Sequence, residues 1–140
     1  MTRRLIADDF VGAWQLDRVI EDRMGAQSGA LTGQASFKVM GGDTLAYGET
    51  GRLTLRQGPV LTATRRYTWA FEGARVQVAF EDGRPFHDFT PQGHAAGTDH
   101  PCGEDYYTVR YDFTGWPRWT AQWTVIGPRK DYVSTSVYVR

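Results

Sequence analysis

Apolar and polar residues alternate with a period of two along most of the chain, and this pattern predicts β-strands. The clearest case is residues 61–71, where one face carries leucine, alanine, arginine and aromatic residues and the other mainly threonine and arginine. Turn residues recur at intervals of about 8 to 12 residues, a spacing typical of all-β proteins. We therefore expect roughly nine or ten short strands.

The predicted strands are separated by Gly, Pro and Asp turns, and two stretches lack the period. The strands begin near Trp14, Ala35, Leu45, Leu53, Leu61, Val76, Pro85, Asp105, Trp119 and Tyr132. Residues 23–33 are small and polar and are predicted as a loop, as is the long segment 90–104. Residues 8–13 are predicted to form at most one helical turn.

The Asp82-Gly83 pair predicts a tight hairpin. A two-residue turn would place Pro85, His87 and Phe89 on the inner face of the return strand. A three-residue loop would reverse that assignment, because successive residues of a strand face opposite sides.

These strands predict one domain, residues 1–140, of all-β class. Short connections favour a closed antiparallel up-and-down barrel of roughly 8–10 strands over a parallel sheet. Closure also removes exposed strand edges.

Charge and cysteine content narrow the classes of partner. The 16 Lys and Arg residues balance 16 Asp and Glu residues, so we expect no nucleic-acid partner. Asp8 and Asp9 interrupt the first apolar stretch, and no run reaches the roughly 18 residues of a membrane span, so neither secretion nor membrane insertion is expected. Cys102 is the single cysteine, so no internal disulfide can form, which favours a cytoplasmic location.

Several polar residues share the phase of the apolar faces and are predicted to point into the barrel. Burying such groups is costly unless a partner, water or a ligand satisfies them. Together with aromatic neighbours they predict a cavity for an apolar small molecule that carries an anionic or carbonyl group. The predicted ligand-binding residues are Arg18, Arg65, Tyr67, Trp69, His87, Asp105, Tyr107, Trp123 and Lys130.

Structural roles compete with this interpretation. Arg65 and Asp105 are equally suited to an internal ion pair, and Arg18 to packing beneath Trp14. Inward-facing tyrosines such as Tyr67 and Tyr107 are more often core residues than ligand contacts. Lys130 and Arg129 lie between two predicted strands. They are expected either to form a solvated turn with a local ion pair or to lie at the barrel mouth, where one of them would meet an anionic ligand.

Candidate catalytic residues cluster around the long loop, and none is assigned a role. His87 or His100 with Asp105 would suit a base with its orienting carboxylate, and Cys102 a nucleophile. Without a nucleophile motif, Cys102 fits a small apolar filler better. The spacing of these residues does not match known zinc sites, so no metal is predicted. No cofactor is identified, although a haem with a histidine ligand stays open by analogy.

The motifs also occur in an order that resembles a known pattern. Gly12-x-Trp14 with Arg18 resembles the opening of lipocalin-like barrels. The fuller set resembles an uncharacterised bacterial family of small lipocalin-like domains of unknown function. The other motifs are Tyr47-x-Glu49-x-Gly51, Arg65-x-Tyr67-x-Trp69, Phe80-x-Asp82-Gly83-Arg84-x-Phe86-His87, His100-x-Cys102-x-x-Asp105-x-Tyr107 and Trp123-x-Val125-x-Gly127-Pro128-x-Lys130-Asp131. The resemblance implies a barrel without an established activity.

Three functions follow, in order of preference. The first is a small-molecule binding barrel, and the second is a hydrolase or isomerase with a His/Asp pair at the barrel mouth. The third is a protein interaction module with Phe86, Trp116 and Tyr132 in an outer apolar patch. A homo-oligomer is compatible with each of them.

Overall fold

The computed structural model describes residues 2–25, 27–56 and 58–140. Within them, one helical turn, α1 (Ala7–Phe10), precedes eleven strands. In chain order these are β1 (Gly12–Asp22), β2 (Gly29–Gly41), β3 (Thr44–Leu55), β4 (Val60–Glu72), β5 (Arg75–Phe80), β6 (Pro85–Phe89), β7 (His94–Ala96), β8 (His100–Cys102), β9 (Asp105–Asp112), β10 (Trp119–Gly127) and β11 (Lys130–Val139). None of the described helical segments is long and apolar enough to cross a membrane.

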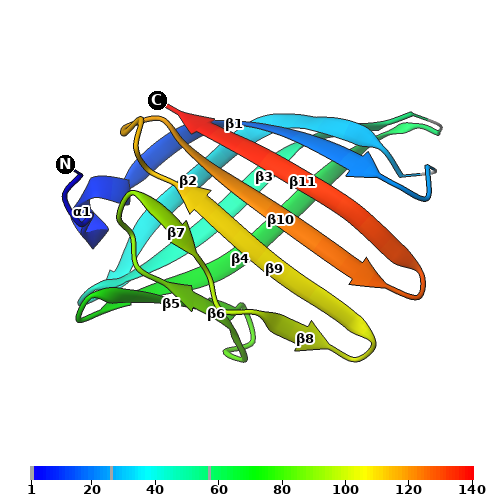
Figure 1. The fold of residues 1–140 in the computed structure, drawn as a ribbon. Coiled ribbons are helices and arrows are strands. Elements are labelled where there is room, and N and C mark those ends of the chain that lie inside the picture. Colours follow the sequence, from blue (N-terminus) through cyan, green and yellow to red (C-terminus); the bar gives the residue numbers. More distant parts are fainter. Residues whose placement is uncertain (1, 26, 57) are drawn as a thin grey trace.

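The strands form one antiparallel sheet that curves into a barrel (Figure 1). Neighbours follow the chain in the order β6-β5-β4-β3-β2-β1-β11-β10-β9-β7, and β8 pairs separately with β9. The predicted all-β, up-and-down antiparallel barrel of lipocalin-like type is confirmed, including its N-terminal helical turn.

The barrel is nearly rather than fully closed. Between β6 and β9 the sheet is bridged by the segment that follows β7. There the Thr98 amide donates to the Asp88 carbonyl at 2.9 Å and the Gly97 amide to the Val109 carbonyl at 3.0 Å. In addition, residues 60–66 of β4 pair with β3, whereas β5 pairs with β4 only from Tyr67 onward. The barrel wall is therefore interrupted beside the first half of β4.

Two predicted loops contain strands. The segment 23–33 was predicted as a loop, but β2 begins at Gly29; residue 26 lies outside the described residues.

The two short strands predicted around Leu45 and Leu53 are one strand, β3. Gly33 and Gly51 face each other in the β2–β3 register, and a Cβ on Gly33 would lie 2.5 Å from the Gly51 Cα. These glycines permit close strand contact instead of forming turns.

The segment 90–104 was also predicted as a loop, and it contains β7 and β8. Both strands pair with the outer edge of β9 through three residues each. Strands this short carry too few alternating residues for a period of two to be visible in the sequence.

The hairpin between β5 and β6 has the three-residue loop, the second of the two alternatives considered for the Asp82-Gly83 turn. The Phe80 amide donates to the Arg84 carbonyl at 2.9 Å, and Pro85, which a two-residue turn would have placed inward, is exposed. A bulge then adds Phe86, because Val78 pairs with His87 while Ala79 pairs with Pro85. The bulge returns His87 and Phe89 to the inner face, where both are buried as predicted.

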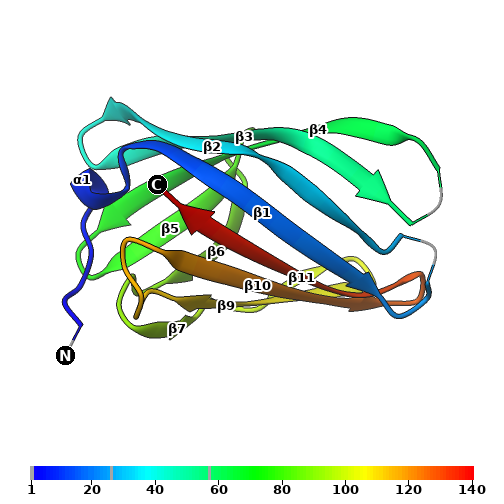
Figure 2. The ribbon, with the colours of Figure 1, turned by 90° about the horizontal axis from the view of Figure 1, so that it is seen from above.

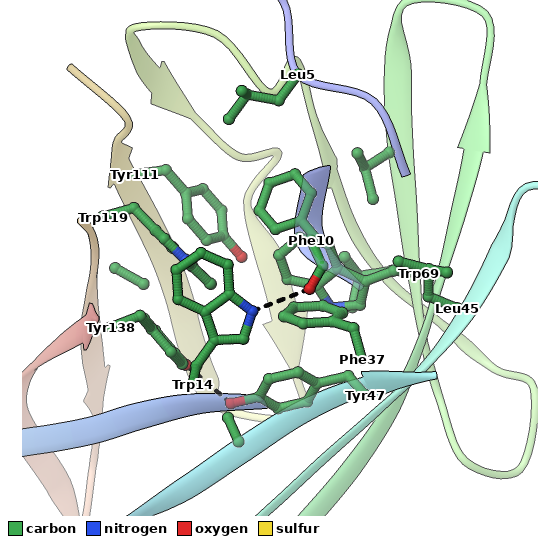
Figure 3. Packing of buried hydrophobic residues seen from close by; sticks show 14 of the residues in the cluster. Leu5, Phe10, Trp14, Phe37, Leu45, Tyr47, Trp69, Tyr111, Trp119 and Tyr138 are labelled. Carbon is green, nitrogen blue, oxygen red and sulfur yellow. Dashed lines mark hydrogen bonds between the residues drawn. The ribbon is translucent and has the colours of Figure 1, made fainter. Parts of the chain in front are cut away.

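One end of the barrel is filled with aromatic rings (Figure 3). Phe10 of α1 is 0% exposed, and six ring centroids lie within 6.0 Å of its own. Trp14 Nε1 donates to the Phe10 carbonyl at 2.9 Å and holds α1 against the sheet. Figure 2 shows α1 at this end and the β1–β2 and β10–β11 turns at the opposite end. We call the two ends of the barrel the closed end and the open end.

Candidate ligand-binding site

The open end of the barrel contains a cavity of about 330 Å³. Most of its wall is aromatic or aliphatic, with a few polar groups. It is lined by Ile20, Arg65, Tyr67, Phe80, Arg84, Phe86, His100, Cys102, Tyr107, Trp123, Val125, Tyr132 and Ser134. A cavity of this size and composition is typical of small-molecule sites.

Stacked rings form one wall of the cavity. Phe86 and Trp123 are nearly parallel, with centroids 4.9 Å apart and an interplanar angle of 8°. Phe80 stacks on Phe86 at 4.5 Å, and the His100 ring meets Phe86 at 5.0 Å. Such flat surfaces offer large contact areas to a planar ligand at little cost in side-chain entropy.

The cations around the cavity differ in their partners. Arg84 pairs with Asp82 at 2.8 Å. Lys130 Nζ lies 3.3 Å from an Asp105 carboxylate oxygen and donates to the Tyr107 hydroxyl at 3.1 Å. The exposed Arg65 guanidinium lines the cavity, and it has neither an ion pair nor a side-chain hydrogen bond with any described residue. Arg65 is thus available to an anion from outside the chain.

A smaller chamber of about 40 Å³ lies deeper in the barrel. It shares Arg65, Tyr67, Phe86 and Trp123 with the larger cavity, so these four residues form the boundary between the two spaces. Trp69, predicted to bind the ligand, lines this inner chamber and belongs to the hydrophobic core.

Arg18 and Glu49 form a buried ion pair beside the inner chamber. Arg18 donates two hydrogen bonds to the Glu49 carboxylate at 2.7 and 2.9 Å, and a third from Nε to Ser136 Oγ at 2.7 Å. The Tyr47 hydroxyl donates to Glu49 at 2.6 Å and lies 2.9 Å from the Tyr138 hydroxyl (Figure 3). The exposed fractions of Arg18 and Glu49 are 6% and 7%.

Mutual hydrogen bonding keeps this pair charged. Burial alone would raise the pKa of Glu49, but its hydrogen bonds with Arg18 hold that pKa below its usual value. Burial also opposes the charge of Arg18, and the hydrogen bonds to Glu49 outweigh it and raise the pKa of Arg18. The predicted internal ion pair of Arg65 with Asp105 is wrong, because Asp105 pairs with Lys130 instead. The internal ion pair of the barrel is formed by Arg18 and Glu49.

His87 lies at the inner chamber and is 6% exposed. Its Nε2 is 2.8 Å from the Tyr111 hydroxyl, and its Nδ1 has no hydrogen-bond partner among the described residues. Burial lowers the pKa of His87 from 6.5 to about 3, so the imidazole is neutral at pH 7.

The candidate catalytic residues are only partly brought together. His100 and Cys102, both on β8, line the cavity, as the enzyme hypothesis requires. Asp105 instead pairs with Lys130, and neither His87 nor His100 forms an ion pair or hydrogen bond with it in the described part of the chain. No group of three or more metal-ligating side chains occurs among the described residues.

Several lining residues were not predicted from the sequence. Glu49 shares the phase of Leu45 and Tyr47, which was the available signal for it. Phe86 and Tyr132, predicted in an outer apolar patch, line the cavity, and Trp116 packs on Trp14 at 5.4 Å. The predicted outer patch is therefore wrong: Phe86 is the bulged residue of β6 and faces the cavity, Tyr132 lines it from β11, and Trp116 lies in the β9–β10 connection against Phe10 and Trp14.

Comparison with known proteins places the chain among barrels. The S-type phycobiliprotein lyase CPES from Guillardia theta has a similar structure (TM-score 0.70, 11% identity), with 96% of this chain and 89% of that chain covered. A protein of unknown function of the DUF3598 family from Nostoc punctiforme is also similar (TM-score 0.63, 12% identity), and the alignment covers 98% of this chain and about half, 49%, of that one. No similar curated protein sequence was found. The model of a family of unknown function (DUF6314) matches residues 10–140.

Proposed function

The chain belongs to the DUF6314 family of unknown function, and from this premise we propose that it binds a small, planar, largely apolar molecule with an anionic group. The molecule occupies the cavity at the open end of the barrel. Its rings stack against Phe86 and Trp123, and its anionic group lies near the cavity mouth beside Arg65.

The unpartnered guanidinium of Arg65 is the observation that carries this proposal. Arg18 and Arg65 both belong to the inward phase of their strands. Arg18 has a buried carboxylate and a hydroxyl within hydrogen-bond distance, whereas Arg65, opposite Glu49 in the β3–β4 register, forms no ion pair or side-chain hydrogen bond with the described residues. A planar guanidinium beside stacked rings matches a carboxylate, sulfonate or phosphate attached to an aromatic body.

Two fluorescent probes that differ by one anionic group test the role of Arg65. 8-Anilinonaphthalene-1-sulfonate carries a sulfonate that N-phenyl-1-naphthylamine lacks, while the rings are the same. We expect both to bind the wild-type protein. Arg65→Leu should raise the Kd of the sulfonate roughly fivefold, since an exposed ion pair contributes about 1 kcal/mol, and should leave the Kd of the neutral probe unchanged.

Two further variants complete the fluorescence titration. Arg66→Leu is the matched control, because Arg66 is the next residue on the opposite face of β4 and does not line the cavity. Trp123→Ala should weaken both probes about tenfold through lost stacking area. Equal effects of Arg65→Leu and Arg66→Leu on the sulfonate would contradict the proposed role of Arg65, and binding that is insensitive to Trp123→Ala would contradict the cavity as the site.

Native mass spectrometry of the purified protein addresses the natural ligand. We expect an aromatic acid to copurify with the wild-type chain and to be depleted in Trp123→Ala. A copurifying molecule without an anionic group would contradict the proposed ligand class.

A further inference from the structure

We infer that the Nδ1–H group of His87 is the hydrogen-bond donor for an uncharged carbonyl oxygen at the inner end of the bound molecule. This inference rests on the proposed function, because the carbonyl must enter through the same cavity. It adds a second polar group to the ligand, at the end opposite the anion that Arg65 binds.

The hydrogen bond with Tyr111 determines which nitrogen of His87 carries the proton. The Tyr111 side chain is buried, and among the described residues its hydroxyl has one partner, His87 Nε2 at 2.8 Å. If the hydroxyl donates to Nε2, the proton of the neutral imidazole is on Nδ1 and one buried donor lacks a partner. In the other tautomer, both the tyrosine proton and the Nδ1 lone pair lack partners. Each unsatisfied buried polar group is destabilising, and the Nδ1–H tautomer leaves fewer of them, so it is favoured.

The position of the ring directs this donor away from the barrel wall. A Cβ on Gly97 would lie 3.1 Å from His87 Cδ2, so the Cδ2 edge of the ring is against the bridging segment. Nδ1 is on the opposite edge. The rings of Phe86 and Trp123 meet the imidazole plane at 90° and 87°, which offers Nδ1–H at most a weak contact with a ring face.

The size and charge of the inner chamber select the chemical group. Its volume of about 40 Å³ is close to that of one water molecule, about 30 Å³, so it accommodates a terminal group and excludes a ring. Of the ionisable groups that line it, Glu49 neutralises Arg18 and His87 is neutral, and the remaining cation, Arg65, is exposed and belongs to the boundary with the larger cavity. A carboxylate beside His87 would therefore meet a neutral donor instead of a cation, whereas a carbonyl needs only that one donor. The ligand must pass Phe86 and Trp123, where its planar part would remain.

Two naphthoates test the donor. 6-Acetyl-2-naphthoate carries an anion at one end and a carbonyl at the other. In 6-isopropyl-2-naphthoate a methyl group of similar size replaces the carbonyl oxygen. We expect calorimetry to show about tenfold tighter binding of the acetyl compound to the wild-type protein, as a site built around a hydrogen bond discriminates against an analogue that lacks it.

Two substitutions separate the nitrogens of the ring. In His87→Asn the side-chain amide lies near the position of Nδ1, so the preference for the acetyl compound should persist. In His87→Gln the amide extends toward the position of Nε2 and Tyr111, so the preference should disappear. NMR of the wild-type imidazole nitrogens, which needs no variant, should show the proton on Nδ1 at neutral pH.

The outcomes distinguish this inference from the proposed function. If both naphthoates bind in an Arg65-dependent manner but with equal Kd, or if His87→Gln keeps the preference, the inference is overturned and the cavity function stands. A proton on Nε2 overturns it independently of any ligand. Failure of both naphthoates and of the fluorescent probes to bind would overturn both proposals.

Discussion

The closed and open ends of the barrel are built from the same strands and the same inward phase, yet one is solid and the other hollow. At the closed end, α1 inserts Phe10 among six aromatic rings. At the open end, Tyr67, Phe86 and Trp123 surround a cavity of about 330 Å³. Inward-facing aromatic residues therefore do not fill a barrel by themselves; a segment from outside the sheet is needed.

The difference separates stability from binding along the barrel axis. We expect substitutions at the closed end to lower the free energy of unfolding. Substitutions at the open end should change ligand binding with little effect on folding, because the rings that line the cavity, such as Phe86 and Trp123, are only partly buried. The buried ion pair of Arg18 with Glu49 lies between the two regions.

The largest effect is expected for Phe10→Ala. Loss of this ring should lower the free energy of unfolding by about 4–5 kcal/mol, since it removes a buried side chain and leaves a void. The half-buried Phe86 is the matched residue at the open end, and Phe86→Ala should cost less than about 2 kcal/mol. Urea unfolding measures both, and equal losses would contradict the division of the barrel into two ends.

The next effect is expected for the buried ion pair. Glu49→Leu should lower the free energy of unfolding by about 3–4 kcal/mol, because the Arg18 charge would remain buried without its partner. Arg18→Met combined with Glu49→Leu should recover most of this loss in the same urea experiment. A double variant as unstable as the single one would show that the surrounding tyrosine hydroxyls, and not the pair, determine the cost.

A smaller effect is expected from pH through His87. Because the folded pKa of His87 is about 3 and its unfolded value is 6.5, the unfolded chain binds a proton in this range while the folded chain does not. Stability from this residue is complete above pH 6.5 and is lost as pH falls toward 3. Between pH 7 and pH 4 the loss is about 3 kcal/mol.

The comparison with His87→Asn isolates this contribution, because acidic residues also titrate in acid. Urea midpoints from pH 7 to pH 4 should fall less steeply for His87→Asn than for the wild-type protein. Parallel curves would mean that His87 is protonated in the folded state.

The smallest effect on folding is expected for Arg65→Leu. Its exposed side chain has no ion pair or side-chain hydrogen bond with the described residues, so the free energy of unfolding should change by less than about 0.5 kcal/mol. Thermal unfolding of Arg65→Leu beside Arg66→Leu checks this. A loss above 2 kcal/mol in Arg65→Leu alone would indicate a structural role for the guanidinium.

Much of the barrel follows from local sequence. The period of two in β4, β9 and β10 assigns the inward phase of Tyr67, Tyr107 and Trp123, and all three line the cavity. This works because a strand with one buried face must alternate regardless of its partners. The phase also identifies Arg18 and Arg65 as inward residues with unusual chemistry.

The pairing of these residues does not follow from local sequence. Glu49 is 31 positions from Arg18 and becomes its partner only through the β1–β2–β3 order. Gly33 and Gly51 resemble turn residues, although their role is contact between two adjacent strands. A hollow end, likewise, depends on which segment covers each end of the barrel.

The bulge at Phe86 also offsets the length of the preceding loop by one residue, which returns the inward phase of β6. A shortened or lengthened hairpin would normally turn a whole strand inside out, but an unpaired residue can absorb such a change. With it, Phe86 and His87 both reach the interior from adjacent positions. The three-residue loop and the bulge thus compensate for each other, and a change in the length of one requires a matching change in the other if the imidazole is to stay in place.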